Sequence, residues 1–182
     1  MTPGYIYSYP VEWDGSIATE PIVSRPSELA LDFSINFLGE DSRAVITDPS
    51  YGASLVDITP SLEFSVTTKV PVTGQKAICW SVYSARFDTI FIFDGNTTTI
   101  TLLDPWSGAI KGTIDGAADT VANLDAKANE QYLYVLNGAA YVSVIDNTGL
   151  TQGDMPKEIQ NFDLSSLGSP QGHQGLAIYP SD

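Results

Sequence analysis

The chain has 182 residues, of which 43% are hydrophobic and 16% charged, which suits one globular domain with a substantial core. Acidic residues number 22 and basic residues 8, so the net charge is −14. A nucleic-acid-binding protein needs a basic surface to displace counterions from phosphates, and this composition excludes that class. No apolar run of the sequence is long enough to span a bilayer.

Neither the first residues nor the cysteine content fixes a cellular compartment. The opening MTPGYIYSYP is not basic and no apolar stretch follows it, so it does not have the pattern of a signal peptide. A single cysteine, Cys79, excludes an internal disulfide framework. It stands in the apolar run Ala77–Trp80, which favours a buried, unreactive thiol over a nucleophile.

Strand patterning extends through almost the whole chain. Short β-branched or aromatic runs are bounded by Gly, Pro, Asn and Asp. The strands expected in chain order are residues 5–9, 29–37, 44–47, 53–58, 62–70, 77–83, 89–93, 98–103, 109–114, 132–136 and 140–145. The one helix-like stretch, residues 124–131, is short and poorly patterned. Many short, evenly spaced strands indicate a sandwich, a barrel or a propeller.

An internal repeat distinguishes these three folds. Residues 43–60, 88–105 and 131–148 each contain a strand, a turn and a second strand that closes on an aspartate. An apolar strand precedes each copy and a more polar strand follows it, so each unit has four strands. These units recur at about the period of a propeller blade, which a sandwich has no reason to show. The predicted fold class is therefore all-β, a β-propeller of four-stranded antiparallel blades.

The chain is expected to form one domain, residues 1–182, with partial blades at its ends. The complete blades are predicted at about residues 27–72, 75–117 and 119–166. Residues 4–24 supply only the last two strands of a blade, and residues 172–180 only a first strand. Either the ends join and close a four-bladed ring, or the chain is half of a larger ring. In the second case its open edges need a second half-propeller or a second copy.

Several segments resemble the lactonase-like, YVTN-type seven-bladed propellers, a WD40-like architecture. TGQKAICW (residues 73–80) is similar to the family's GQ-x-A-x-CW segment, and YLYVLNGAAYVSVID (132–146) resembles its repeat. DPSYGA (48–53), residues 157–166 and residues 174–179 resemble a fungal branch of secreted, 3-carboxymuconate-cyclase-like proteins. The resemblance covers about residues 27–180, the C-terminal half of such a protein. It implies a secreted, acidic β-propeller of lactonase-like fold.

The same resemblance implies a lactonase or cyclase acting on a small lactone or carboxylate in the central channel. Cyclases of this kind use a histidine, arginines and a glutamate, because a tricarboxylate needs cationic clamps and a group that moves a proton. This chain has one histidine, His173, and three arginines, Arg25, Arg43 and Arg86. Arg43 and Arg86 are expected in solvated turns. The cyclase set is therefore not matched, and the catalytic residues are unknown, with His173 as the one candidate.

Polar residues near the inner strands are candidates for a ligand site in the channel. His173 stands just before an expected inner strand, near the channel mouth, where it could act as an acid, a base or a ligand. The alternative, which is favoured, is a histidine that caps a turn. Asp119 and Asn123 flank an inner strand, where such pairs more often hydrogen-bond neighbouring blades. No cofactor is predicted, although a divalent cation could use oxygen donors among Asp32, Asn36, Asp119, Asn123 and Asp125.

The sequence favours a binding role outside the cell. Asn96-Thr97-Thr98 is an N-glycosylation triplet in an expected exposed hairpin, and it agrees with the resemblance to secreted proteins. Trp80 is expected in the core, whereas Trp13 and Trp106 lie at turns, exposed or packed between blades. The preferred function is a non-catalytic binding or scaffold module for a small-molecule or carbohydrate ligand. The alternative is a lactonase or cyclase-like enzyme whose catalytic residues lie in an absent N-terminal half.

Overall fold

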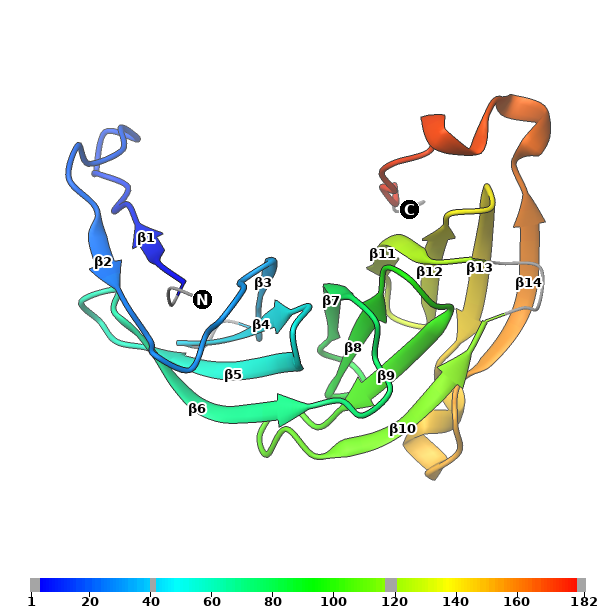
Figure 1. Ribbon diagram of the computed structural model, residues 1–182, viewed down its shortest axis with the longest axis horizontal. Helices are drawn as coiled ribbons and strands as arrows, with labels where there is room; N and C mark the ends of the chain where they lie inside the picture. The colour runs from blue at the N-terminus through cyan, green and yellow to red at the C-terminus, as the bar shows by residue number, and fades with distance from the viewer. Residues whose placement is uncertain (1–3, 40–41, 117–120, 180–182) are drawn as a thin grey trace.

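The protein forms an open arc of antiparallel sheets. The computed structural model describes residues 4–39, 42–116 and 121–179. One sheet has two strands, β1–β2, and three sheets have four strands each, β3–β6, β7–β10 and β11–β14 (Figure 1). The strands are β1 Ile6–Ser8, β2 Ile22–Ser24, β3 Ser34–Phe37, β4 Arg43–Asp48, β5 Gly52–Ile58, β6 Phe64–Pro71, β7 Ile78–Ser84, β8 Thr89–Asp94, β9 Thr99–Leu103, β10 Ile110–Asp115, β11 Asn123–Ala128, β12 Tyr132–Asn137, β13 Tyr141–Asp146 and β14 Lys157–Asp163. The predicted all-β fold of four-stranded blades is confirmed.

Within each four-stranded blade the strands pair in chain order, from the concave side of the arc outwards (Figure 1). The second and third strands lie between neighbours on both faces and therefore consist of continuous apolar runs, as in β8, TIFIFD. The fourth strand lies at the outer edge, and in β6 half-buried and exposed residues alternate along most of its length. Among residues 4–39, 42–116 and 121–179, no helix is long and apolar enough to cross a membrane.

The hydrophobic core lies between successive blades rather than inside any one blade. Ile90 and Ile92 of β8 belong to a cluster with Val45 and Leu55 of the preceding blade. Phe91 and Phe93, on the opposite face of β8, belong to a second cluster with Leu133, Val135 and Ile145 of the following blade. Because successive residues of a strand point to opposite faces, one apolar strand contributes to both interfaces.

A buried aspartate at the end of the second strand fixes the start of the inner strand. Asp94, 3% exposed, accepts hydrogen bonds from the backbone N–H groups of Lys76 (2.6 Å), Ala77 (3.0 Å) and Asn96 (2.9 Å). Asp48 does the same one blade earlier, where its carboxylate accepts from Ala30 (3.0 Å) and Leu31 (2.7 Å). The carboxylate therefore satisfies backbone donors that the sheet leaves unpaired.

The third blade carries an amide at this position. Asn137, 2% exposed, ends β12 and accepts a hydrogen bond from the N–H of Ala139 at 3.2 Å. The predicted position Asp119 and the neighbouring residues 117–120 lie outside the described residues.

The arc does not close on itself. Figure 1 places β1 and β2 at one end and the C-terminal segment at the other. The alternative of a closed four-bladed ring is therefore wrong for this chain, and the open-ring alternative describes it. Both ends expose apolar side chains: Tyr5, Tyr7, Phe33, Ile35 and Phe37 at the first, and Ile159, Phe162, Leu167 and Tyr179 at the second.

One local expectation differs from the structure. Residues 172–179 form no strand in the described chain, because no second strand of that blade lies beside them. The N–H of Leu176 instead donates to Asp125 Oδ2 at 2.8 Å. Most of residues 124–131, the poorly patterned helix-like stretch, belong to β11, the inner strand of its blade, where Ala126 and Ala128 pair with Val135 and Leu133 of β12.

The carboxylate of Asp94 supplies the first test. Asp94→Ala leaves three backbone N–H groups without their acceptor, and we expect it to lower the free energy of unfolding by roughly 2 to 4 kcal/mol. Asp94→Asn keeps one acceptor oxygen, as Asn137 does in the third blade, and should cost less. Urea unfolding measures both, with the exposed Asp115→Ala as the matched control. An alanine variant as stable as that control would contradict this role of Asp94.

Candidate functional site

The inner strands β3, β7 and β11 line the concave side of the arc, where the channel of a closed propeller runs (Figure 1). The residues predicted for this channel are His173, Asp119 and Asn123. Asn123 begins β11, and His173 lies in the segment that returns from β14 towards β11. Asp119 lies outside the described residues. Of the three predicted site residues, the structure describes His173 and Asn123.

Asn123 connects two blades. Its side chain is 4% exposed, and its Nδ2 donates to the backbone carbonyls of Thr97 (3.4 Å) and Thr99 (3.3 Å) in the preceding blade. Asn36 of β3 bonds in the other direction at the interface before it, from Nδ2 to the carbonyl of Ser81 in the following blade at 3.1 Å. Both amides satisfy backbone carbonyls at a blade interface, which is the alternative that the sequence favoured for such residues.

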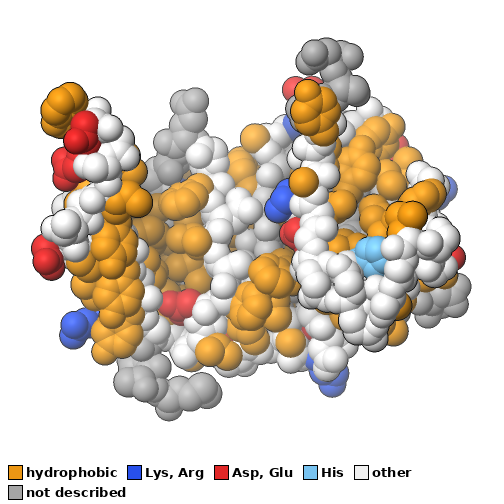
Figure 2. Space-filling view, turned by 90° about the horizontal axis from the view of Figure 1, so that it is seen from above, with side chains coloured by type: hydrophobic (Ala, Val, Ile, Leu, Met, Phe, Trp, Pro, Cys, Tyr) orange, Lys and Arg blue, Asp and Glu red, His pale blue; other side chains and the backbone are white. Residues whose placement is uncertain are grey.

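His173 lies in the C-terminal segment that follows β14. It follows the short 3-10 turn Pro170–Gly172, and its N–H donates to the Pro170 carbonyl at 3.1 Å. Its ring reaches the surface at the C-terminal end of the arc (Figure 2), whereas Nε2 is buried without a hydrogen-bond partner in the described chain. Within the same residues, no hydrogen bond or ion pair joins His173 to Asn123, although the segment of His173 is bonded to β11 through Leu176 and Asp125.

The oxygen donors considered for a cation are used separately. Asp125 Oδ2 accepts from the Leu176 N–H, and its Oδ1 accepts from Ala126 N–H at 2.8 Å and lies 3.5 Å from Lys127 Nζ. Asp125 therefore anchors the C-terminal segment to β11. In residues 4–39, 42–116 and 121–179, no group of three or more His, Cys, Asp or Glu side chains is arranged to hold a metal ion.

Asp32 is a carboxylate with an unfavourable environment. Both of its oxygens are buried without hydrogen-bond partners among the described residues, and the backbone of Gly4 covers them so closely that a β-carbon there would clash. Burial, together with the charge of nearby Asp48, raises the pKa of Asp32 above its usual range. A raised carboxyl pKa stabilises the fold at low pH, and that contribution is lost as the pH rises through the folded-state pKa.

Two further predicted residues lie on the blade β7–β10. Asn96 is exposed in the turn between β8 and β9, where its N–H donates to Asp94 Oδ1. Its side chain is thus in the position expected of a glycosylation acceptor. Cys79 is half-buried. The pKa of its thiol is raised mainly by burial and to a smaller extent by the charge of Asp94. A raised pKa leaves less thiolate, in agreement with an unreactive cysteine.

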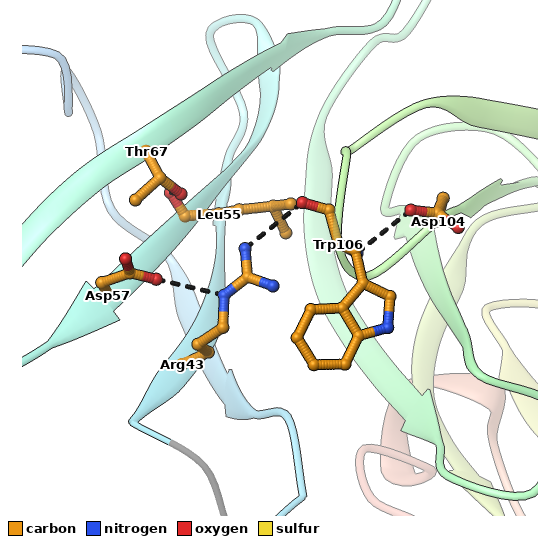
Figure 3. A network of polar contacts seen from close by, with 6 residues as sticks. All are labelled: Arg43, Leu55, Asp57, Thr67, Asp104 and Trp106. Carbon is orange, nitrogen blue, oxygen red and sulfur yellow. Dashed lines mark hydrogen bonds and ion pairs between the residues drawn. The ribbon is translucent and has the colours of Figure 1, made fainter.

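A polar network that the sequence does not predict joins the first two complete blades (Figure 3). Arg43 Nε lies 3.1 Å from Asp57 Oδ1, and one Nη donates to the Trp106 carbonyl at 3.3 Å. The Arg43 side chain is only 16% exposed, so its expected place in a solvated turn is wrong, whereas Arg86 is 57% exposed as expected. The network was missed because Arg43 and Trp106 meet only when the blades stack.

Comparisons with known proteins support the fold. No protein-family model matches the chain, and no curated protein matches it. Among solved structures, it is similar to a candidate 6-phosphogluconolactonase from Bacteroides fragilis, with a TM-score of 0.67 and 11% identity over 86% of this chain and 51% of that chain. A second candidate 6-phosphogluconolactonase, from Bacteroides uniformis, gives a TM-score of 0.66 and 12% identity over 90% and 51%. BamB from Moraxella catarrhalis gives 0.60 and 16% over 88% and 42%.

These likenesses define the architecture of the chain. Its fold is a β-propeller fold, as the sequence indicates, and it is shared with the two candidate lactonases and with BamB. The chain spans about half the length of the solved structures that it matches. At such low identity the likeness concerns the fold and leaves the activity open, since one propeller architecture serves many unrelated functions.

Proposed function

We propose that this chain is a non-catalytic binding module of an extracellular β-propeller. The observation that carries the proposal is the use of the inner-strand polar groups to join blades. Asn36 and Asn123 bond backbone carbonyls of adjacent blades, and Thr47 Oγ1 of β4 donates to the Cys79 carbonyl at 2.5 Å. Side chains committed to such bonds serve the scaffold rather than a reaction.

The charge distribution also favours binding over lactone chemistry. A phosphorylated lactone or a tricarboxylate needs cationic side chains around it, and the chain carries a net charge of −14. Three of its eight basic residues are held in structural contacts: Arg43 with Asp57, Lys69 over the Tyr51 ring at 3.9 Å, and Lys111 with Thr89 at 2.8 Å. A lactonase or cyclase-like activity is the second candidate, favoured by the fold of the solved relatives.

The location outside the cell rests on the sequence. Several segments of the chain resemble a fungal, 3-carboxymuconate-cyclase-like branch whose members are secreted. Asn96 lies exposed in a hairpin turn. We infer that the protein is a secreted or cell-surface glycoprotein of that branch.

The open ends of the arc lead us to propose a paired assembly. The chain covers 42% to 51% of the solved propellers, so two copies supply about one ring. Each end also exposes apolar side chains, among them Phe37 (56%) and Phe162 (52%), which a blade of a second copy would bury. We propose that the second copy docks head to tail, the N-terminal end of each against the C-terminal end of the other.

Enzyme assays separate the two functions. Incubation with 6-phosphogluconolactone, unphosphorylated lactones and carboxymuconates should give no turnover above buffer, because among the described residues no side chain hydrogen-bonds to the His173 ring. Turnover that disappears in His173→Ala but persists in the neighbouring Gln174→Ala would overturn the non-catalytic proposal and establish the enzymatic one.

The native protein tests the proposed location. We expect it in the culture medium or on the cell surface, with one N-linked glycan that an endoglycosidase removes. Asn96→Gln should abolish the corresponding mass shift, whereas Asn129→Gln, outside any acceptor triplet, should leave it unchanged. Recovery of the unmodified protein inside the cell would contradict secretion.

Light scattering tests the assembly. We expect a particle of about twice the 19.5 kDa chain mass, and Phe37→Asp should shift it to the monomer by placing a charge in the proposed interface. Ile110→Asp is the matched control, since Ile110 is exposed to a similar degree on β10, away from both ends. A wild-type monomer at every concentration would exclude the paired ring.

A further inference from the structure

A groove between the first two complete blades lies at the end of the strands that is remote from Asn96. β4 begins there at Arg43, β5 ends there at Ile58, and Trp106 stands in the turn after β9. The turn that holds Asn96 lies at the opposite end of β9, since it precedes Thr99. The groove is open to solvent and has a volume of about 530 Å³.

Trp106 is held in one orientation from several directions. Its indole Nε1 donates to Asp88 Oδ2 at 3.0 Å, and its backbone N–H donates to Asp104 Oδ1 at 3.1 Å. Its carbonyl accepts from Arg43, whose guanidinium carbon lies 5.1 Å from the indole centroid (Figure 3). Arg43 is held in turn by Asp57, so side chains of two blades fix the ring.

Despite these contacts, Trp106 remains 59% exposed. Trp13 is also exposed, at 97%, but it has neither the groove nor the network around it. An aromatic ring that is already fixed binds a ligand without losing rotamer entropy, which is how preorganisation increases affinity. The network at Trp106 thus gives the groove a rigid apolar wall.

The rest of the groove is polar and rich in hydroxyl groups. Besides Arg43, Trp106 and Ile58, it is lined by Ser42, Asp57, Thr59, Thr67 and Thr68. Asp57 is 52% exposed and uses Oδ1 for Arg43, so its second oxygen can accept hydrogen bonds from a ligand. An apolar ring face beside hydroxyl and carboxylate groups matches a pyranose, whose C–H face is apolar and whose edge carries hydroxyls.

The local charge selects among sugars. Asp57 lines the groove and is paired with Arg43, and Asp88 and Asp104 accept hydrogen bonds from Trp106. The nearby cation Lys111 donates to the Asp88 carbonyl and to Thr89, so an acidic sugar would meet three carboxylates against two cations, and the net charge of −14 acts in the same direction. A neutral sugar has no such penalty.

We propose that the Arg43–Trp106 groove binds a neutral hexopyranose unit of an oligosaccharide in contact with the exposed part of the Trp106 ring. This site rests on the binding role proposed above and specifies its ligand class. The two proposals can be tested separately. An absence of sugar binding would not change the outcome of the enzyme assays, and lactone turnover would not change whether a sugar binds in the groove.

The test is a titration of the whole chain followed by NMR of the indole N–H groups, of which the three tryptophans supply three. The probes are hexasaccharides of β-linked glucose, β-linked N-acetylglucosamine and α-linked mannose, with oligogalacturonate as the acidic comparison. We expect at least one neutral probe to shift the Trp106 signal and to leave Trp13 in place. The three neutral arms then identify the sugar that the groove prefers.

Variants establish that the groove is the binding site. Trp106→Ala should weaken binding about tenfold or more, whereas Trp13→Ala should leave it unchanged. Because Trp106 also joins two blades, thermal unfolding is measured alongside, and Thr68→Val serves as a second variant. It removes a groove hydroxyl that makes none of the network bonds, and should weaken binding without lowering the unfolding temperature.

Three outcomes would overturn the proposal. They are the absence of binding by every neutral probe, equal binding by Trp106→Ala, and tighter binding of oligogalacturonate than of the neutral sugars.

Discussion

The arrangement of the arc depends on how the chain passes from the outer edge of one blade to the inner strand of the next. At that crossing the backbone leaves one sheet before it joins another, so its N–H groups need acceptors. Asp48 and Asp94, both almost fully buried, provide those acceptors and simultaneously cap the hairpin turns that follow them. One carboxylate thus fixes the inner strand relative to the second strand, and the blade faces stack in the resulting positions.

The repeat was predictable because its marker residues perform local tasks. Asp104 accepts hydrogen bonds from the backbone N–H groups of Ser107 and Trp106, and Asp146 accepts one from the N–H of Thr148. These bonds hold the pKa of each aspartate below its usual range. Such tasks depend on neighbouring residues and therefore leave a pattern in the sequence. The misjudged segment, residues 172–179, depends instead on a partner strand, and no such strand lies beside it in the described chain.

The candidate sites were less predictable, because they depend on contacts between blades. Residue type and strand position correctly suggested that Asn123 would bond a neighbouring blade, but nothing local distinguished Arg43 from the solvated Arg86. The difference arises from Trp106, which is 63 residues away and approaches Arg43 only across a blade interface. His173 remains without a side-chain partner in the described chain, as its sequence context offered none.

The alternation of isoleucine and phenylalanine in β8 has a consequence for how the molecule folds and opens. The blade β7–β10 contributes to both large core clusters, so it is held by contacts with both of its neighbouring blades. The stability of such an array is approximately the sum of the intrinsic stabilities of the blades and of the interfaces between neighbouring blades. A blade at either end has only one such interface. Opening therefore proceeds inwards from the terminal sheets, and the backbone amides of β8 are the last to exchange with solvent.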